Sequence, residues 1–262
     1  MGVDGEAGRR GIVLRVDIHC HLLPGVDDGP SSIEESVELA ATAVRDGTRT
    51  IVATPHVRGD MFTDVASLRE RVREVQHRLA RYSLALNVLQ GGELGHDMVG
   101  RLAQDELEAI AQGPAGARWL LVETPFEGLD AAFHSACDEL RERRFGIVLA
   151  HPERVLGVLA DGGDALRREL DGGSLLQVNS WSLIGGHGRE AREAAGELVR
   201  AGKVAAIATD AHPGWRKPEL TRGVAAARAL GLDRERAARL ADTAPLELLA
   251  RGVPALSSAL TA

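Results

Sequence analysis

Short apolar segments of β-type residues alternate along this chain with segments that have the pattern of amphipathic helices. In the first of them, Val16 and Ile18 alternate with polar residues, as expected for a strand with one buried face. Strand–helix alternation predicts an α/β fold with a parallel sheet, and a closed barrel is one way to complete such a sheet. The seven predicted strands cover residues 14–18, 50–54, 84–90, 119–122, 146–150, 175–178 and 204–208.

Capping motifs mark the beginnings of two predicted helices. Ser32 and Glu35 form a Ser-x-x-Glu capping box, and Ser67 and Glu70 form a second one. The predicted helices cover 33–45, 67 to about 82, 129–144 (which carries His134), 219–230 and 234–251.

The 262 residues are 44% hydrophobic, which is enough for one substantial core. No apolar run approaches the length of a membrane span, so we expect neither a transmembrane helix nor a signal peptide. Residues 1–13 are predicted to be a disordered leader, 14–255 a single domain and 256–262 a tail. Cys20 and Cys137 lie in motifs that do not need either residue to be paired, which indicates a reducing cytoplasm.

The charge balance is acidic, with 31 Lys and Arg against 38 Asp and Glu and a formal net charge of −7. No block of basic residues suggests a nucleic-acid groove, so we expect no nucleic-acid partner. An acidic chain that handles a phosphate group needs local positive charge from metal ions or from well-placed arginines.

Histidine, aspartate and glutamate residues stand at or just beyond the carboxyl ends of the predicted strands. His19 and His21 point to the same side of the first strand, about 7 Å apart, where they form either a pair of metal ligands or a chance pair. In an α/β barrel the loops that follow the strands meet on one face, so these residues predict a metal site. Its candidate ligands are His19, His21, Asp28, His56, Glu93, His151, Asp210 and His212.

Several segments, taken together and in this order, resemble the PHP (polymerase and histidinol phosphatase) superfamily. Within it, the chain is similar to the bacterial manganese-dependent protein-tyrosine phosphatases that are encoded with capsule and exopolysaccharide genes. The resemblance covers about residues 14–250. It rests on Asp17-Ile18-His19-Cys20-His21, Asp27-Asp28-Gly29, Thr54-Pro55-His56, Gly92-Glu93, His134, Ala150-His151-Pro152-Glu153-Arg154, Gln177-Val178-Asn179-Ser180 and Thr209-Asp210-Ala211-His212.

The resemblance implies a distorted seven-stranded (β/α) barrel that holds three divalent ions. Mn²⁺ is the expected metal, and mixed imidazole and carboxylate ligands also suit Fe²⁺ or Zn²⁺. Besides being a ligand, His134 has the alternative of being an ordinary surface residue of its helix. One ion would be bound by His19, His21, Glu93 and Asp210, a second by Glu93, His134 and His151, and a third by Asp28, His56 and His212.

The chemistry that the resemblance implies is hydrolysis of a phosphate ester by a metal-bridging hydroxide, because the ions lower the pKa of bound water. Arg154 and Arg216 follow two metal-bearing strands and would bind the phosphate, since a planar guanidinium matches two oxygens at once. A surface salt bridge is the alternative for each arginine. A tyrosine phenolate, with a pKa of about 10, leaves without needing a strong general acid.

Cys137 and Arg143 match the Cys-x5-Arg spacing of the thiol-based tyrosine phosphatases. The residues between them include three acids and no glycine and are predicted to be helical, so their amides are already hydrogen bonded. Acidic neighbours also raise the pKa of a thiol, and we therefore interpret the match as chance. Glu123 and Asn179 end predicted strands at the same edge. A supporting and a purely structural role both stay open for Glu123, and Asn179 is expected to support a ligand.

Four functions compete. The first is a phosphotyrosine phosphatase that acts on a tyrosine autokinase in the control of polysaccharide biosynthesis, favoured by the resemblance of Val26-Asp27-Asp28-Gly29 and Ser31-Ser32 to that branch. The second is a histidinol-phosphate or other small phosphoester phosphatase, which the fold alone does not exclude. A nuclease or proofreading module is disfavoured by the lack of basic and aromatic groove residues. An inactive metal-binding scaffold is disfavoured by the complete set of ligand residues.

Overall fold

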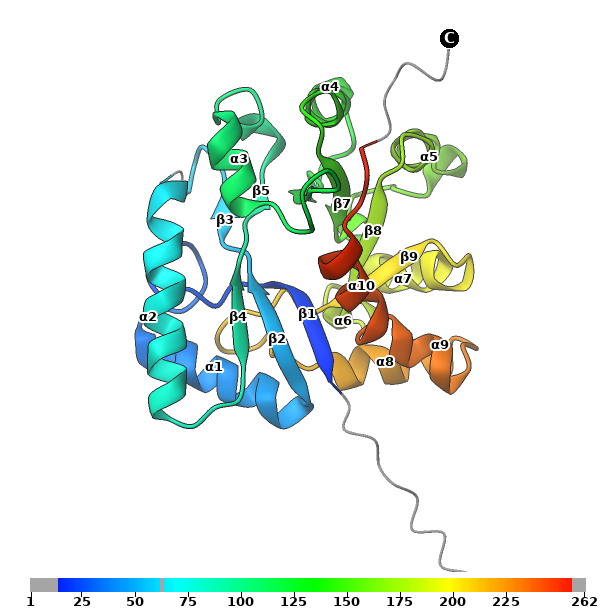
Figure 1. Cartoon of the computed structure of the whole chain (residues 1–262). Coiled ribbons are helices and arrows are strands. Elements are labelled where there is room, and N and C mark those ends of the chain that lie inside the picture. The colour runs from blue at the N-terminus through cyan, green and yellow to red at the C-terminus, as the bar shows by residue number, and fades with distance from the viewer. Residues whose placement is uncertain (1–13, 62–63, 256–262) are drawn as a thin grey trace, which may run out of the picture.

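The strands form two parallel sheets of three and six strands (Figure 1). The computed structural model describes residues 14–61 and 64–255, so the predicted leader and tail lie outside the described residues. The first sheet contains β1 (Arg15–Cys20), β2 (Thr48–Ala53) and β4 (Asn87–Gln90). The second contains, in spatial order, β3 (His56–Val57), β5 (Glu93–Leu94), β6 (Trp119–Glu123), β7 (Gly146–Ala150), β8 (Leu175–Asn179) and β9 (Val204–Ala208).

Two of the predicted strands are each interrupted, and the chain passes from the first sheet to the second at the interruption. Pro55, which has no N–H to donate to a ladder, lies between β2 and β3. Gly91 and Gly92 lie between β4 and β5, and a Cβ on Gly91 would lie 2.5 Å from Cγ1 of Val52, so only glycine fits there. The interruptions leave His56 and Glu93 at the starts of β3 and β5, where they are register partners.

The first and last strands meet near their carboxyl ends through a few backbone contacts. The amide of Asp210 donates to the carbonyl of His19 at 2.7 Å, and the amide of His21 donates to the carbonyl of Ala211 at 3.1 Å. These hydrogen bonds connect the carboxyl end of β1 in the first sheet with the residues that follow β9 in the second sheet. They place His19 and His21 beside Asp210.

The predicted α/β class with parallel strands is confirmed, whereas the arrangement of the strands differs from the predicted seven-stranded barrel. Within the described residues there are nine strands in two sheets, because the interruptions at Pro55 and at Gly91 break the ladders between neighbouring strands. Side chains from both sheets nevertheless share a core with α10 (Thr243–Arg251). This core consists of Val16, Ile18, Val52, Trp119, Leu121, Val148, Ala150, Ala206, Ala208, Leu248 and Val253.

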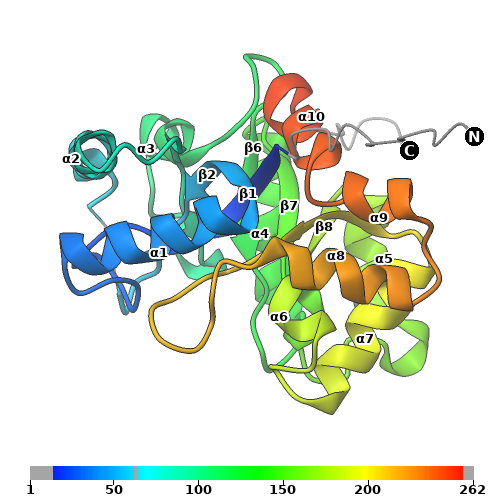
Figure 2. The same cartoon turned by 90° about the horizontal axis from the view of Figure 1, so that it is seen from below.

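Helices surround the sheets, with α1 and α2 beside the first sheet (Figures 1 and 2). The indole N–H of Trp119, the first residue of β6, donates to the carbonyl of Leu248 at 3.0 Å, so α10 lies at the amino end of this strand. None of the helices in the described ranges has the length and apolar character needed to cross a lipid bilayer. The helices are α1 (Ile33–Asp46), α2 (Leu68–Arg81), α3 (Gln104–Ile110), α4 (Ala131–Glu142), α5 (Asp164–Asp171), α6 (Ser180–Leu183), α7 (Arg189–Arg200), α8 (Leu220–Ala229), α9 (Arg234–Arg239) and α10.

Local details of the helices differ from the prediction in several places. The cap of α1 is present, since Oγ of Ser32 accepts the amide of Glu35, but the Glu35 carboxylate binds Ser31. The second predicted capping box is wrong, because Ser67 ends a 3-10 turn, η1 (Val65–Ser67), and its hydroxyl donates to the carbonyl of Asp64, the residue before that turn. The predicted helix over 234–251 is divided into α9 and α10, and α5, α6 and α7 were not predicted.

Candidate metal centre

The structure brings eight of the nine predicted metal ligands together at the carboxyl ends of the strands, and it adds Glu123. These side chains come from β1, β3, β5, β6 and the loops after β1, β7 and β9. The residues form four overlapping groups that could each hold an ion. The groups are His19, His21 and Glu93; His19, His151 and Asp210; His56, Glu93 and Glu123; and His21, Asp28, His56 and His212.

The innermost group is a triangle of nitrogen and oxygen atoms. Nε2 of His19 and Nε2 of His21 are 3.4 Å apart, and Oε2 of Glu93 lies 3.3 and 3.4 Å from them. Two ligand atoms that are each about 2.1 Å from one ion lie about 3.0–3.5 Å apart at bond angles near 90–110°. The spacing of the three atoms therefore fits one transition-metal ion. Oδ1 of Asp210 completes the surroundings at 3.5 and 3.4 Å from the two nitrogens.

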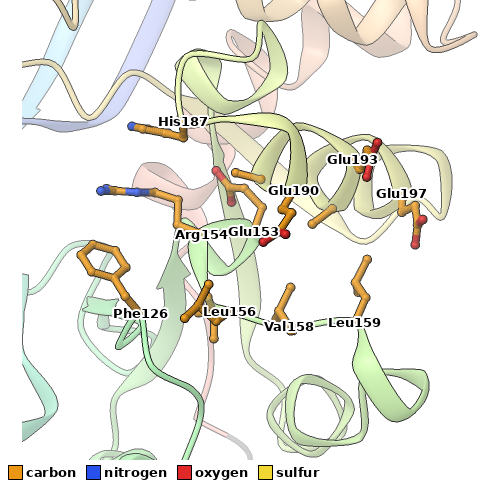
Figure 3. A pocket seen from close by; sticks show the side chains of 14 residues that line it. Phe126, Glu153, Arg154, Leu156, Val158, Leu159, His187, Glu190, Glu193 and Glu197 are labelled. Carbon is orange, nitrogen blue, oxygen red and sulfur yellow. The ribbon is translucent and has the colours of Figure 1, made fainter.

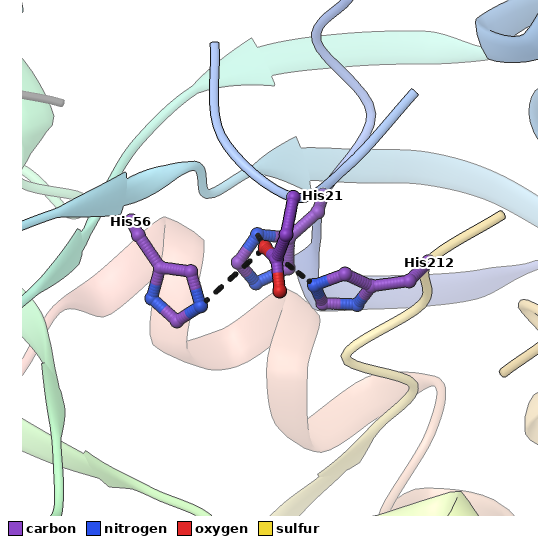
Figure 4. A group of neighbouring side chains, drawn as sticks. His21, His56 and His212 are labelled. Carbon is purple, nitrogen blue, oxygen red and sulfur yellow. Dashed lines mark hydrogen bonds and ion pairs between the residues drawn. The ribbon is translucent and has the colours of Figure 1, made fainter. Parts of the chain in front are cut away.

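A second, more exposed group surrounds the carboxylate of Asp28. Figure 4 shows the imidazoles of His21, His56 and His212 converging on one point. Oδ1 of Asp28 lies 3.0 Å from Nε2 of His212 and 3.7 Å from Nε2 of His56. The Asp28 side chain is 50% exposed, whereas those of Glu93 and Asp210 are buried. This group therefore faces the solvent side of the cluster, where a substrate can enter.

Glu123 joins the site although its role was left open by the sequence. Its Oε2 lies 3.7 Å from Nδ1 of His56, which in turn is 2.9 Å from Oε2 of Glu93. Burial and the nearby Glu93 raise the pKa of Glu123 to about 7. A cation is also close by, since one guanidinium nitrogen of Arg58 donates to the two oxygens of Glu123 at 3.2 and 3.1 Å. Its position in the sequence could have identified Glu123 as a candidate ligand, because it ends β6 at the same edge as the other candidates.

His134 lies apart from these four groups, on α4. Its Nδ1 contacts Oε1 of Glu169 at 2.6 Å, and the other carboxylate oxygen of Glu169 pairs with Arg141. Arg141 also donates to the hydroxyl of Ser174 at 2.9 Å. The imidazole is thus part of a buried polar network between α4 and α5. The structure does not bring it to the other predicted ligands.

Separate substitutions of Glu123 and of His134 should show which of the two residues binds metal. We expect Glu123→Gln to weaken Mn²⁺ binding by about 10–100-fold, as is typical when a metal site loses one supporting group. His134→Gln keeps a donor for Glu169 and should leave the Mn²⁺ content and kcat unchanged. Metal content by mass spectrometry and the melting temperature check both variants. If a folded His134→Gln protein loses its metal, the result would show that His134 is a metal ligand after all.

Hydrogen bonds on the outer side of the cluster fix the orientation of the imidazoles. Nδ1 of His19 contacts Oε1 of Gln177 at 2.9 Å, and Nδ1 of His21 contacts Oδ2 of Asp27 at 2.6 Å. With one ring nitrogen held in this way, the other is presented to the centre of the cluster. Asn179 supports the site as expected, since its amide donates to Oδ2 of Asp210 at 2.8 Å.

Unpartnered buried atoms indicate that the cluster is built for a cation. Oε2 of Glu93 and Nδ1 of His56 have no hydrogen-bond partner among the described residues, although they are only 2.9 Å apart. Although burial opposes ionisation, the charges of His19 and His56 hold the pKa of Glu93 well below its usual value. An ionised, buried carboxylate oxygen that faces ring nitrogens without hydrogen bonding to them is the donor that a divalent ion uses. The residues present therefore fit a metal centre.

Backbone conformation is unusual at two of the ligands. His151 has φ of 38° and Asp210 has φ of 50°, both in the left-handed region that side chains other than glycine rarely adopt. Such positions cost about 1–3 kcal/mol each and concentrate at functional sites. At both residues the strand has just ended, and the strained turn directs the side chain into the cluster.

The two predicted arginines stand together at the edge of the cluster. One guanidinium nitrogen of Arg154 lies 3.1 Å from Oδ2 of Asp210, and Arg216 donates to the same oxygen. Arg216 is only 7% exposed, and its Nε has no hydrogen-bond partner among the described residues. A hydrogen bond closes the loop that carries Arg216: the amide of His212 donates to the carbonyl of Arg216 at 2.9 Å. Two guanidinium groups therefore converge on one carboxylate oxygen at the edge of the cluster.

The fold and this centre together define a class: α/β proteins in which histidines and carboxylates at the carboxyl ends of parallel strands form groups that could bind metal ions. Residues 15–249 match the family described as "Capsular polysaccharide synthesis, CpsB/CapC". The chain belongs to the CpsB/CapC family, which confirms the resemblance inferred from the sequence.

Relatives of this chain include named tyrosine phosphatases. It is 32% identical to tyrosine-protein phosphatase YwqE of Bacillus subtilis over 198 residues, which are 75% of this chain and 77% of the relative. It is 30% identical to tyrosine-protein phosphatase CpsB of Streptococcus pneumoniae over 171 residues, 64% and 68% of the two chains.

Two solved structures are similar to this chain in fold. A structure from a study of YwqE and CpsB, described as unique metal-dependent tyrosine phosphatases, superposes with a TM-score of 0.75 at 29% identity, covering 89% of this chain and 93% of the other. A phosphotriesterase homology protein from Escherichia coli has a TM-score of 0.59 at 12% identity, covering 89% and 98%, and shares the fold alone.

Proposed function

We propose that this chain is a metal-dependent phosphoric monoester hydrolase that removes phosphate from tyrosine residues of proteins. The observation that carries the proposal is the convergence of buried histidines and carboxylates with two arginines at one edge of the sheets. The family and the names of the relatives support phosphotyrosine as the substrate.

We further propose that the centre holds three divalent ions, with Mn²⁺ as the expected metal. When bound, such ions supply positive charge to a phosphate group and lower the pKa of water that attacks it. Glu123 replaces His134 in the proposed ligand set because it lies within the cluster. The two sheets would then act together as the wall of one distorted barrel, closed by the contacts between β1 and the end of β9. The proposed ligands are His19, His21, Asp28, His56, Glu93, Glu123, His151, Asp210 and His212.

Arg154 and Arg216 are proposed to bind the phosphate oxygens. Both contact Oδ2 of Asp210, so they are already held in place, and Nε of the nearly buried Arg216 has no hydrogen-bond partner in the described part of the chain. Fixed donors of this kind require no reorganisation when charge moves among the phosphate oxygens. The tyrosine phenolate has a pKa of about 10 and departs readily.

The thiol alternative lacks support. Cys137 lies inside α4 and is fully buried. Burial and the nearby Glu169 raise the pKa of its thiol well above the usual value, so no thiolate is available as a nucleophile.

The natural substrate is proposed to be a tyrosine autokinase in polysaccharide biosynthesis. The description of the family, which names capsular polysaccharide synthesis, supports the pathway but does not name the substrate. A cytoplasmic location is proposed with it. Cys20 and Cys137 are both buried and unpaired, which suits a reducing compartment.

Parallel assays on a phosphotyrosine peptide and on histidinol phosphate test the proposed function. With the same Mn²⁺-loaded protein, we expect kcat/KM for the peptide to exceed that for histidinol phosphate by at least about tenfold, since tenfold corresponds to 1.4 kcal/mol of transition-state binding. Phosphate release is measured for both. A preference for histidinol phosphate, or no hydrolysis of phosphotyrosine, would contradict the proposal.

A further inference from the structure

A groove leads away from Arg154 along the surface of the protein. Its volume is about 710 Å³, within the range of roughly 300–1,000 Å³ that is usual for ligand pockets. Figure 3 shows Phe126, Arg154 and His187 at one end and Glu193 and Glu197 at the other. The ring of Phe126 lies 4.5 Å below the Arg154 guanidinium, so this end is continuous with the proposed phosphate site.

The two walls of the groove differ in chemistry. One wall is the apolar stretch Leu156–Leu159, in which the Leu156 side chain is 67% exposed. The other wall is the face of α7 that carries Glu190, Glu193 and Glu197. Glu193 lies 3.9 Å from Arg189, whereas the other two glutamates have no ion-pair partner among the described residues. An exposed leucine and uncompensated glutamates along one groove suit a ligand that is both apolar and cationic.

A buried carboxylate faces the same groove. Glu153 is only 2% exposed, and its Oε1 accepts the amide of Asn179 at 2.9 Å. The Ser182 hydroxyl is close enough to act on its carboxyl group, but Oε2 forms no well-aligned hydrogen bond among the described residues, and Glu153 lines the groove. A buried carboxyl oxygen without a well-formed hydrogen bond costs free energy, which a donor from a bound ligand would recover. This feature is independent of the exposed glutamates of α7.

We propose that this groove, the peptide groove, binds the chain segment that flanks the phosphotyrosine and selects segments that carry lysine or arginine. This inference rests on the proposed function. The groove has arginine at the end near the metal centre and glutamates at the other end, which matches a peptide with an anionic phosphotyrosine and cationic flanking residues. From Glu190 to Glu197 the helix rises about 10 Å, the length of about three extended residues.

Peptides that differ only in their flanking charges test the inference. Each contains one phosphotyrosine and carries lysine, alanine or glutamate two to four residues away, on the amino side or on the carboxyl side. We expect kcat/KM to be about fivefold to tenfold higher for lysine than for alanine on one side only, the size of one or two exposed ion pairs. Glutamate on that side should lower it, and both effects should shrink with added salt.

Charge reversal in the groove provides the reciprocal measurement. In Glu190→Lys/Glu197→Lys the preference should change from the lysine peptide to the glutamate peptide, with each rate normalised to the hydrolysis of free phosphotyrosine by the same protein. Glu74→Lys, at an exposed position of α2 outside the groove, is the matched control and should keep the lysine preference.

Equal kcat/KM values for all peptides, or a lysine preference that persists in the double variant, would overturn the peptide groove. Either result with intact hydrolysis of free phosphotyrosine leaves the proposed function standing. If neither free phosphotyrosine nor any peptide is hydrolysed, the proposed function fails and the inference with it.

Discussion

Replacing Glu93 with glutamine should lower kcat on a phosphotyrosine peptide by more than about 100-fold, beyond what the loss of a group that merely supports a ligand costs. The two oxygens of Glu93 reach four imidazoles: Oε2 lies 3.3, 3.4 and 2.9 Å from nitrogens of His19, His21 and His56, and Oε1 lies 2.8 Å from His151. A glutamine has nearly the same shape, but it brings an uncharged amide to a place that requires a carboxylate.

Steady-state kinetics and metal analysis on the same preparation check this expectation. The purified Glu93→Gln protein should contain less Mn²⁺ than the unchanged protein and keep a cooperative thermal transition. Glu74→Gln, a change of the same type at an exposed position, serves as the control. A Glu93→Gln enzyme with full metal content and a rate within about tenfold, or 1.4 kcal/mol of barrier, would remove Glu93 from the centre.

Replacing Arg216 with alanine should lower kcat by about 10²–10³-fold, the usual loss for one preorganised donor to a transition state. Arg216 is nearly buried, donates to Oδ2 of Asp210 and lies in a turn closed by the hydrogen bond from His212. Its position is therefore fixed before substrate binds. Arg216→Lys should recover only part of the activity, because an ammonium group cannot bind two oxygens in one plane.

Metal content distinguishes a loss of phosphate binding in Arg216→Ala from a loss of metal such as that expected in Glu93→Gln. Arg216→Ala should retain its Mn²⁺, since the arginine contacts Oδ2 of Asp210, whereas Oδ1 is the oxygen that lies 3.5 and 3.4 Å from Nε2 of His19 and His21. Steady-state kinetics on protein of known Mn²⁺ content test whether Arg216 binds the phosphate. An Arg216→Ala enzyme within about threefold of the unchanged rate, which is under 1 kcal/mol of barrier, would exclude this residue from phosphate binding.

Most of the metal centre could be predicted from the sequence because one rule places it. Residues that end parallel strands meet at one edge, so His19, Glu93 and Asp210 could be grouped without knowing a single distance. The same rule would have found Glu123, which ends β6. The rule could not place His134, because this residue lies on a helix and not at the end of a strand. The direction of its side chain depends on which face of the helix packs against the protein.

Contacts between residues that are far apart in the sequence could not be predicted from the sequence. Gln177 supports His19 from 158 residues away, and nothing in the local pattern of either residue indicates the pair. The division of the predicted strands had local signals in Pro55 and in Gly91 and Gly92. Their effect on the sheets was not predictable, because it depends on how closely Gly91 approaches Val52 on the neighbouring strand.

Metal removal and replacement is the most direct test of the central claim, that phosphotyrosine hydrolysis depends on a divalent metal centre at this edge. The protein is dialysed against a chelator until metal analysis finds none, and then assayed on an aryl phosphate before and after titration with Mn²⁺. We expect activity to disappear on chelation and to return as the site fills with Mn²⁺, with little change in the fold. Full activity in protein without detectable metal would contradict it.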